Sequence, residues 1–120
     1  MTQTADTDAI TRLVHDYIKA AQTGDEALMR TVFHADSTIC GYVGPELFSA
    51  PIEEFHEWNR GNGPAPAVRE EIASIDVAGT VASVRIELDN WTGHRFTDFF
   101  NLLKIDGKWW VMNKVFHMHE

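Results

Sequence analysis

Two charged residues stand among large hydrophobic residues in the C-terminal quarter of the sequence. Alternate positions from 96 to 102 are Phe, Asp, Phe and Leu, and those from 110 to 118 are Trp, Met, Lys, Phe and Met. Alternate residues of a strand face the same side of a sheet, so Asp98 and Lys114 each lie within a predicted apolar row. A buried carboxylate without a partner is costly, and Asp98 must therefore be protonated, paired or beside a wet cavity.

The two rows predict neighbouring strands that are joined by a turn at Asp106-Gly107. If residue i pairs with about residue 212 − i, Asp98 and Lys114 lie opposite each other on one face, where the lysine favours an ionised carboxylate. The pair is either the polar group of a ligand pocket or a buried structural contact. In the first case, the pocket wall is built from Phe96, Phe100, Trp110, Met112 and Phe116.

Tyr17 is expected on the buried face of the first helix. Apolar residues recur with helical spacing between positions 7 and 22, which predicts an amphipathic helix that ends at Gly24. A buried phenol packs as an aromatic ring and bonds its hydroxyl, and we expect Tyr17 to reach the cavity beside Asp98 and Lys114. Asp25 is the predicted N-cap of a second, shorter helix.

The whole chain predicts an α+β domain. A short strand over 37–42 follows the second helix, a third helix begins at 49–51 and ends near Arg60, and four strands follow Val68. Turn signals at 78–79, 92–93 and 106–107 separate these strands. The order ααβαββββ describes a single domain over residues 1–120, in which a curved antiparallel sheet forms a cone closed by about three N-terminal helices.

Composition and charge exclude several classes of partner. The 120 residues are 44% hydrophobic and carry a formal net charge of −8, and the ten basic residues are scattered along the chain. Nucleic acid and anionic membrane surfaces are therefore not expected partners. No apolar run approaches the ~18 residues that span a bilayer, and the N-terminus lacks the pattern of a signal peptide, so a cytoplasmic location is expected.

Sequence motifs for metals and cofactors are weak or missing. His117 and His119 share one strand face, but no HExxH motif or cysteine pair accompanies them, and no metal site is predicted. The sequence also has no GxGxxG, P-loop or GxSxG motif. We therefore predict a domain that uses no cofactor.

The sequence resembles the nuclear transport factor two-like (NTF2-like) superfamily over nearly its whole length. The resemblance rests on the segment 17–21 with Gly24-Asp25 after it, on 33–37 (FHADS), and on 96–100 (FTDFF) followed by 106–109 (DGKW). Within the superfamily, the ending at 102–104, 107–109 and 113–115 is most similar to the SnoaL-like, putative lumazine-binding group. The resemblance implies a cone-shaped α+β fold, which hosts enzymes, carriers and partner-binding domains.

The ketosteroid isomerases of this superfamily offer a comparison at three positions. Tyr17 and Asp98 match the tyrosine and the protonated aspartic acid that donate hydrogen bonds to the enolate in those enzymes. Gly41 stands in place of their general-base aspartate, so steroid isomerisation by that mechanism is not expected.

Three kinds of function fit these observations. The first is a small-molecule binding domain with an apolar, aromatic-lined pocket for a small apolar or aromatic ligand. The alternative is a cofactor-independent isomerase, cyclase or dehydratase that uses acid–base groups in the same pocket, with Asp98 and Tyr17 as candidate catalytic residues. The third is a bare dimerisation module.

The sheet face opposite the helices is expected to be an interface between two copies of the chain. Odd-numbered positions of the last two strands place an apolar surface there, and no further predicted element covers it. We predict a homodimer packed sheet to sheet, as the superfamily resemblance also implies. The residues of the predicted interface are Phe99, Leu103, Trp109, Val111 and Val115.

Overall fold

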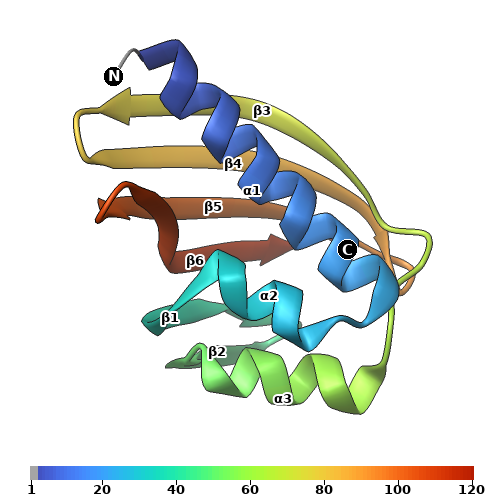
Figure 1. Ribbon diagram of the computed structural model, residues 1–120. Helices are drawn as coiled ribbons and strands as arrows, with labels where there is room; N and C mark the ends of the chain where they lie inside the picture. The colour runs from blue at the N-terminus through green and yellow to red at the C-terminus, as the bar shows by residue number, and fades with distance from the viewer. Residues whose placement is uncertain (1–2) are drawn as a thin grey trace.

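Three helices and a six-stranded sheet make up the computed structural model of the protein, which describes residues 3–120 (Figure 1). The helices are α1 (Gln3–Thr23), α2 (Glu26–Val32) and α3 (Glu53–Asn62). The strands are β1 (Phe33–Val43), β2 (Glu46–Pro51), β3 (Arg69–Ala78), β4 (Val81–Trp91), β5 (His94–Ile105) and β6 (Lys108–Met118). The predicted α+β class with a curved sheet is confirmed, and the order along the chain is ααββαββββ.

β2 is a strand that the sequence analysis did not predict. It pairs antiparallel with β1 and lies at one edge of the sheet. Pro51 ends β2 instead of starting the third helix, because an edge strand tolerates a residue that lacks a backbone N–H. α3 begins at Glu53.

Strand pairing is mixed rather than wholly antiparallel. The order across the sheet is β2-β1-β6-β5-β4-β3, and β1 and β6 run parallel, whereas every other neighbouring pair is antiparallel. A parallel pair needs a long connection, and here β2, α3 and β3–β5 all lie between the two strands in the chain. The sheet is open and curves around α1, which crosses its concave face (Figure 1).

The helices and hairpins follow the local sequence pattern. α1 buries its predicted apolar stripe against the sheet, with Tyr17 fully enclosed. Asp25 caps α2, because its carboxylate accepts the Leu28 backbone N–H at 3.0 Å. Asp106 and Gly107 both have positive φ, as a two-residue hairpin turn of type I′ requires. No helix among residues 3–120 is long and apolar enough to span a bilayer.

A β-bulge in β6 changes which residues of this strand face the core. Asn101 of β5 pairs with Asn113, whereas the next residue, Leu102, pairs with Val111. Met112 is therefore an extra residue on β6, and the alternation of faces along the strand shifts by one position at this point.

Because of this bulge, four side chains of β6 lie on the opposite sheet face from the one predicted. Trp109 and Val111, predicted on the open sheet face, are buried in the core on the helix side. The Trp109 indole N–H donates to the Asp6 carboxylate of α1 at 3.2 Å. Trp110 and Met112, predicted in the pocket wall, are half-buried and are not among the residues that line the cavity beside Lys114 described below.

The open sheet face keeps a smaller apolar surface than the sequence predicts. Phe99 and Val115 pair across β5 and β6 and are 48% and 40% exposed. Leu103 is half-buried and pairs with Val81 of β4, which is exposed. The apolar part of this face therefore lies on β4, β5 and the second half of β6.

Candidate functional site

Tyr17, Asp98 and Lys114 form a buried cluster between α1 and the sheet. The Tyr17 hydroxyl donates to Asp98 Oδ2 at 2.8 Å, and Lys114 Nζ donates to the Tyr17 oxygen at 2.8 Å. Lys114 Nζ lies 3.7 Å from Asp98 Oδ2, within ion-pair distance. The exposed fraction is 0% for Tyr17 and Asp98 and 5% for Lys114. The phenol thus bridges an acid and an amine that are withdrawn from bulk water.

The contact expected between Asp98 and Lys114 is present, but the strand register differs from the predicted one by two residues. Asp98 pairs with Phe116, and Lys114 pairs with Phe100. Diagonal neighbours of this kind share a sheet face and stay within reach of a long side chain. Tyr17 reaches both of them from α1.

Burial disfavours the charged form of each of the three groups, and it shifts each pKa accordingly. It raises the pKa of Asp98, against the opposing effects of the Lys114 charge and the Tyr17 hydrogen bond. It lowers the pKa of Lys114, against the Asp98 charge. The pKa of Tyr17 lies well above 10, through burial and the Asp98 charge, so the phenol keeps its proton. The pKa values of acid and amine therefore approach each other, which makes a proton easier to pass between them.

A cavity of about 210 Å³ borders Lys114. Among the described residues that line it, Lys114 is the only lysine, arginine or acidic residue, while Tyr17 and Asp98 lie behind it and do not line the cavity. Apolar walls with a few polar groups are typical of small-molecule sites. The aromatic part of the wall consists of Phe48, Phe55, Trp58, Trp91, Phe96 and Phe116.

Aromatic rings surround the Lys114 amine. Nζ lies 4.1 Å from the centre of the Phe55 ring, 5.3 Å from Trp91 and 5.9 Å from Phe116. Ring faces attract a cation, and they offer no hydrogen-bond acceptor of the strength of an oxygen. An ammonium group has three donors, of which Tyr17 and Asp98 engage at most two. One donor therefore remains for an oxygen atom in the cavity.

The predicted site residues that lie before the bulge in β5 and after it in β6 come together. Phe96, Lys114 and Phe116 line the cavity. Phe100 does not line the cavity, but it packs against the buried cluster, with its ring centre 5.1 Å from that of Tyr17. Of the predicted site residues, Trp110 and Met112 are the two that the bulge turns away from the core face.

Four aromatic residues of the cavity were absent from the predicted site. Phe48 belongs to β2, the strand that was not predicted. Phe55 and Trp58 belong to α3, and the narrow apolar stripe of that helix in the sequence is a signal that could have identified them. Trp91 has odd parity on β4, whose even-numbered residues face the core. A shift in register between Leu88 and Trp91 turns its side chain inward, and alternation alone does not reveal such a shift.

Gly41 leaves room for Phe116. The two residues are partners on the parallel strands β1 and β6. A Cβ atom at position 41 would lie 2.8 Å from the Phe116 ring and closer still to its carbonyl oxygen. The space that a side chain at position 41 would enter is thus already filled, and a general base has no place there.

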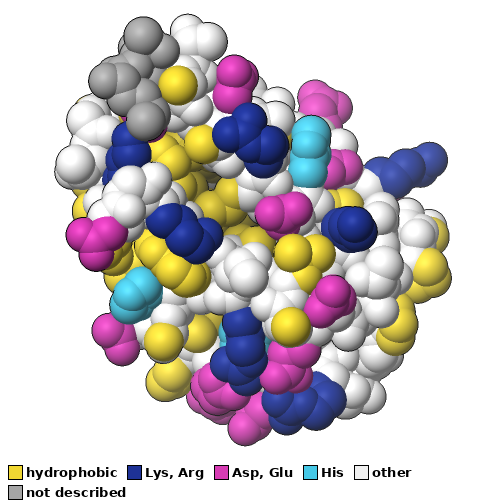
Figure 2. Space-filling view, viewed as in Figure 1, with side chains coloured by type: hydrophobic (Ala, Val, Ile, Leu, Met, Phe, Trp, Pro, Cys, Tyr) yellow, Lys and Arg dark blue, Asp and Glu magenta, His cyan; other side chains and the backbone are white. Residues whose placement is uncertain are grey.

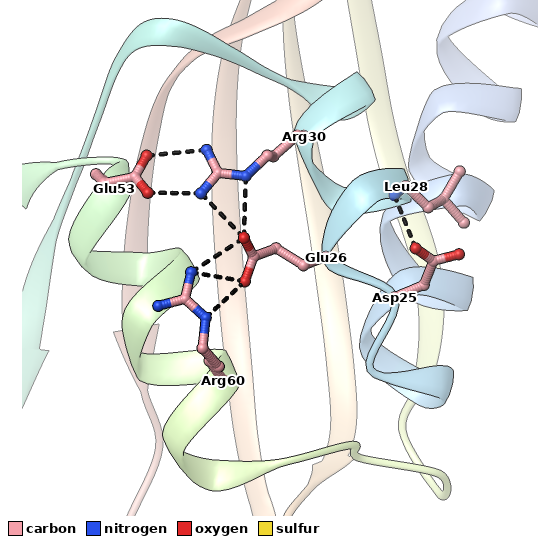
Figure 3. Close-up of polar contacts among 6 residues, drawn as sticks. All are labelled: Asp25, Glu26, Leu28, Arg30, Glu53 and Arg60. Carbon is pink, nitrogen blue, oxygen red and sulfur yellow. Dashed lines mark hydrogen bonds and ion pairs between the residues drawn. The ribbon is translucent and has the colours of Figure 1, made fainter.

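An ion-pair network joins α2 to α3, which carries one wall of the cavity. Glu26 bonds Arg30 within α2 and Arg60 of α3, and Arg30 also bonds Glu53 at the start of α3 (Figure 3). Acidic and basic side chains gather over these two helices in Figure 2. Individual exposed ion pairs contribute little to stability, and here they connect α2 to both ends of α3.

The described part of the chain contains no preformed cluster of metal-binding side chains. No group of three or more His, Cys, Asp or Glu side chains within residues 3–120 is arranged to hold a metal ion. The rings of His117 and His119 lie 4.7 Å apart, and His119 Nε2 bonds the Thr97 hydroxyl at 2.9 Å. Neither histidine lines the cavity beside Lys114.

Comparison with known proteins assigns the chain to a family. The model of the family described as "Putative lumazine-binding" matches residues 5–117. The chain belongs to this family. The predicted resemblance to the NTF2-like superfamily and to its lumazine-binding group is thereby confirmed.

Solved structures of NTF2-like proteins share the whole fold. One from Methylobacillus flagellatus is 47% identical, with a TM-score of 0.95 over 99% of this chain and 96% of that one. Another from Shewanella baltica is 38% identical, with a TM-score of 0.91 over 100% and 98% of the two chains. A relative named Aldolase FrzH, from Cladobotryum sp, is 28% identical over 113 residues, which are 93% of this chain and 90% of its own length.

Proposed function

We propose that this protein binds a small, largely apolar molecule in the cavity beside Lys114, and that an oxygen atom of the ligand accepts a hydrogen bond from the Lys114 amine. One observation carries the proposal: Lys114 belongs to the buried cluster and also forms part of the cavity wall. Aromatic side chains would hold the body of the ligand, and the amine would fix its orientation. A flat ring compound with a carbonyl group meets both requirements.

The family description supports a flat ring compound with carbonyl groups. Lumazine, which the description names, is a flat bicyclic compound with carbonyl groups. Stacking between such a compound and the rings of Phe55 or Trp91 would place a carbonyl oxygen near Lys114. Lumazine is therefore one of the compounds to test, beside simpler aromatic carbonyl compounds.

Titration of the protein with methyl 4-methoxybenzoate, followed by tryptophan fluorescence, tests the proposal, because Trp58 and Trp91 line the cavity. An ester carbonyl accepts a hydrogen bond from an amine but forms no imine with it. Loss of a hydrogen bond from a charged donor costs about 1.5–3 kcal/mol, so Lys114→Met should weaken binding roughly tenfold to a hundredfold. Lys108→Met, which changes an exposed lysine outside this cavity, is the matched control and should leave affinity unchanged.

Native mass spectrometry of gently purified protein would identify a ligand that remains bound. Failure of lumazine and of the aromatic ester to bind, together with the absence of any retained small molecule, would contradict the proposal.

A second candidate function is proton transfer at a carbon atom next to a carbonyl group. Isomerases, cyclases and dehydratases use this step, and so does an aldol reaction, the activity in the name of the Cladobotryum relative. Tyr17 and Asp98 stand behind the amine that would bind the carbonyl oxygen, and they could supply and receive a proton through it.

Deuterium exchange tests the second candidate. In D2O, the protein should speed the exchange of the benzylic α-protons of 4-methoxyphenylacetone, as followed by proton NMR. Asp98→Asn should reduce the exchange rate, whereas Asp106→Asn, in the distant β5–β6 turn, should not. Exchange at the rate of buffer alone would leave the binding domain as the better description.

A further inference from the structure

We infer that the Lys114 amine is a nucleophile, which forms a Schiff base with the carbonyl carbon of an aromatic or aliphatic aldehyde or ketone held in the cavity. The inference rests on the proposed function, because it requires a carbonyl compound in that cavity. It goes beyond hydrogen bonding, since it gives Lys114 a covalent bond to the ligand. Three features of the site carry it: the position of the amine, its surroundings and the proton path behind it.

The position of Lys114 combines burial with access. Its side chain is almost fully enclosed, yet it forms part of the cavity wall. A ligand that fills the cavity therefore meets the amine directly and without competing bulk water. Holding two reacting groups together in this way is itself a large contribution to rate.

The surroundings of the amine favour its neutral, nucleophilic form more than water does. The rings of Phe55, Trp91 and Phe116 replace solvent around Nζ, and burial lowers the lysine pKa. A lysine desolvated in a hydrophobic pocket is a recognised way to activate this residue for attack on a carbonyl. For each unit by which the pKa falls, the neutral fraction at neutral pH rises about tenfold.

The proton that the amine must lose has a defined destination. Lys114 Nζ, the Tyr17 oxygen and Asp98 Oδ2 form a continuous chain with two hydrogen bonds of 2.8 Å. The amine passes a proton to the Tyr17 oxygen while Tyr17 passes its own proton to Asp98. The result is a neutral amine, a neutral phenol and a protonated carboxylic acid. Burial raises the pKa of Asp98, which makes the acid a better acceptor for this proton.

The reaction balances without any further reagent. The nitrogen lone pair attacks the carbonyl carbon, the C=O π electrons move to oxygen, and a proton moves from nitrogen to that oxygen to give a carbinolamine. Asp98 then returns its proton through Tyr17 to the hydroxyl, which leaves as water while the nitrogen lone pair forms the C=N bond. An ammonium group and a carbonyl compound have become an iminium ion and water, and Asp98 is again a carboxylate.

Reductive trapping of the wild-type protein tests the inference directly. The probe is 4-methoxybenzaldehyde with sodium cyanoborohydride, which reduces the iminium ion to a stable amine. The matched ligand without a carbonyl is 4-methoxybenzyl alcohol, whose binding is measured separately by tryptophan fluorescence. Intact-protein mass should rise by one aldehyde minus one oxygen atom, and peptide mapping should place the label on Lys114.

Labelling of Lys114 should be at least about tenfold faster than that of Lys19 or Lys108, because the cavity holds the aldehyde against Lys114 and against neither of the other two. Tyr17→Phe removes the bridging oxygen and should slow labelling while the alcohol still binds. Lys114→Met should abolish the fast label, and Lys108→Met should retain it. Because the main experiment uses the wild-type protein, it does not depend on the folding of any variant.

The outcomes distinguish this inference from the proposed function. Equal labelling of all lysines, or no label while the alcohol still binds, would overturn the Schiff base and leave the binding function in place. If neither the aldehyde, the alcohol nor the aromatic ester binds, both proposals are wrong. Fast, single labelling of Lys114 that the alcohol slows by competition supports both.

Discussion

Removing the negative charge of Asp98 is expected to destabilise the protein strongly. Asp98→Asn keeps the shape of the side chain and an oxygen for the Tyr17 hydroxyl, but it leaves Lys114, 5% exposed, without the counter-charge 3.7 Å away. Breaking one partner of a buried ion pair costs roughly 3–5 kcal/mol. In a domain of 120 residues, each kcal/mol lowers the melting temperature by about 4 °C, so we expect a fall of about 12–20 °C.

Urea unfolding, followed by tryptophan fluorescence, measures this loss in a cycle of four proteins. Lys114→Met alone should also cost stability, because it leaves the buried Asp98 without its counter-charge. The double variant should recover most of the stability, since it leaves neither charge behind. It should not recover binding of the aromatic ester, because the donor in the cavity is gone.

The pH dependence distinguishes the two single variants. In Asp98→Asn, the folded pKa of Lys114 lies below the unfolded value of about 10.4, so the unfolded chain binds more protons between these values and stability rises with pH. In Lys114→Met, the folded pKa of Asp98 lies above the unfolded value of about 3.9, so stability there rises as pH falls. An Asp98→Asn variant within about 1 kcal/mol of the wild type, with no slope of either sign, would refute this account of the cluster.

Three further predictions concern other parts of the fold. We propose a homodimer through the open sheet face, and Phe99→Glu should then halve the mass seen by light scattering; a wild-type monomer at micromolar concentration would contradict this. Trp109→Glu should unfold the protein instead, because that side chain is buried. Gly41→Ala should cost about 1–3 kcal/mol in urea unfolding through collision with Phe116, and an unchanged urea midpoint would contradict the close packing. Burial lowers the pKa of His56, so its share of the stability is present above about pH 6.5 and is lost as pH falls through the lowered pKa; His56→Gln should remove this slope from acid titrations.

Local patterns in the sequence were sufficient to predict most of the fold. Helical spacing identified α1, and the turn at Asp106-Gly107 identified the hairpin of β5 and β6. The parity of Asp98 and Lys114 placed both on the core face, which is why their contact was predicted despite an error of two residues in register. A two-residue error preserves the face of every side chain, whereas a one-residue error reverses it.

The errors arose where the chain departs from regular alternation. The extra residue Met112 turns Trp109 and Val111 inward, and the register shift before Trp91 brings that ring into the cavity. Bulges depend on long-range fit between strands and leave no reliable local signal. β2 was missed for a different reason: the proline at its end, Pro51, is equally typical of the first turn of a helix.

The buried cluster is expected to serve function at some expense of stability. Replacing a buried ion pair with apolar residues of similar volume is often neutral or stabilising, by about 1–4 kcal/mol. The surroundings are already apolar here, with Phe100 and Trp91 against the Tyr17 ring. We therefore expect the triple variant Tyr17→Phe, Asp98→Leu, Lys114→Met to match or exceed the wild type in urea unfolding, while it loses affinity for the aromatic ester and all trapping by the aldehyde. A triple variant as unstable as Asp98→Asn alone would show instead that the polar cluster is required for the fold itself, and the case for a ligand-directed amine would then lose this support.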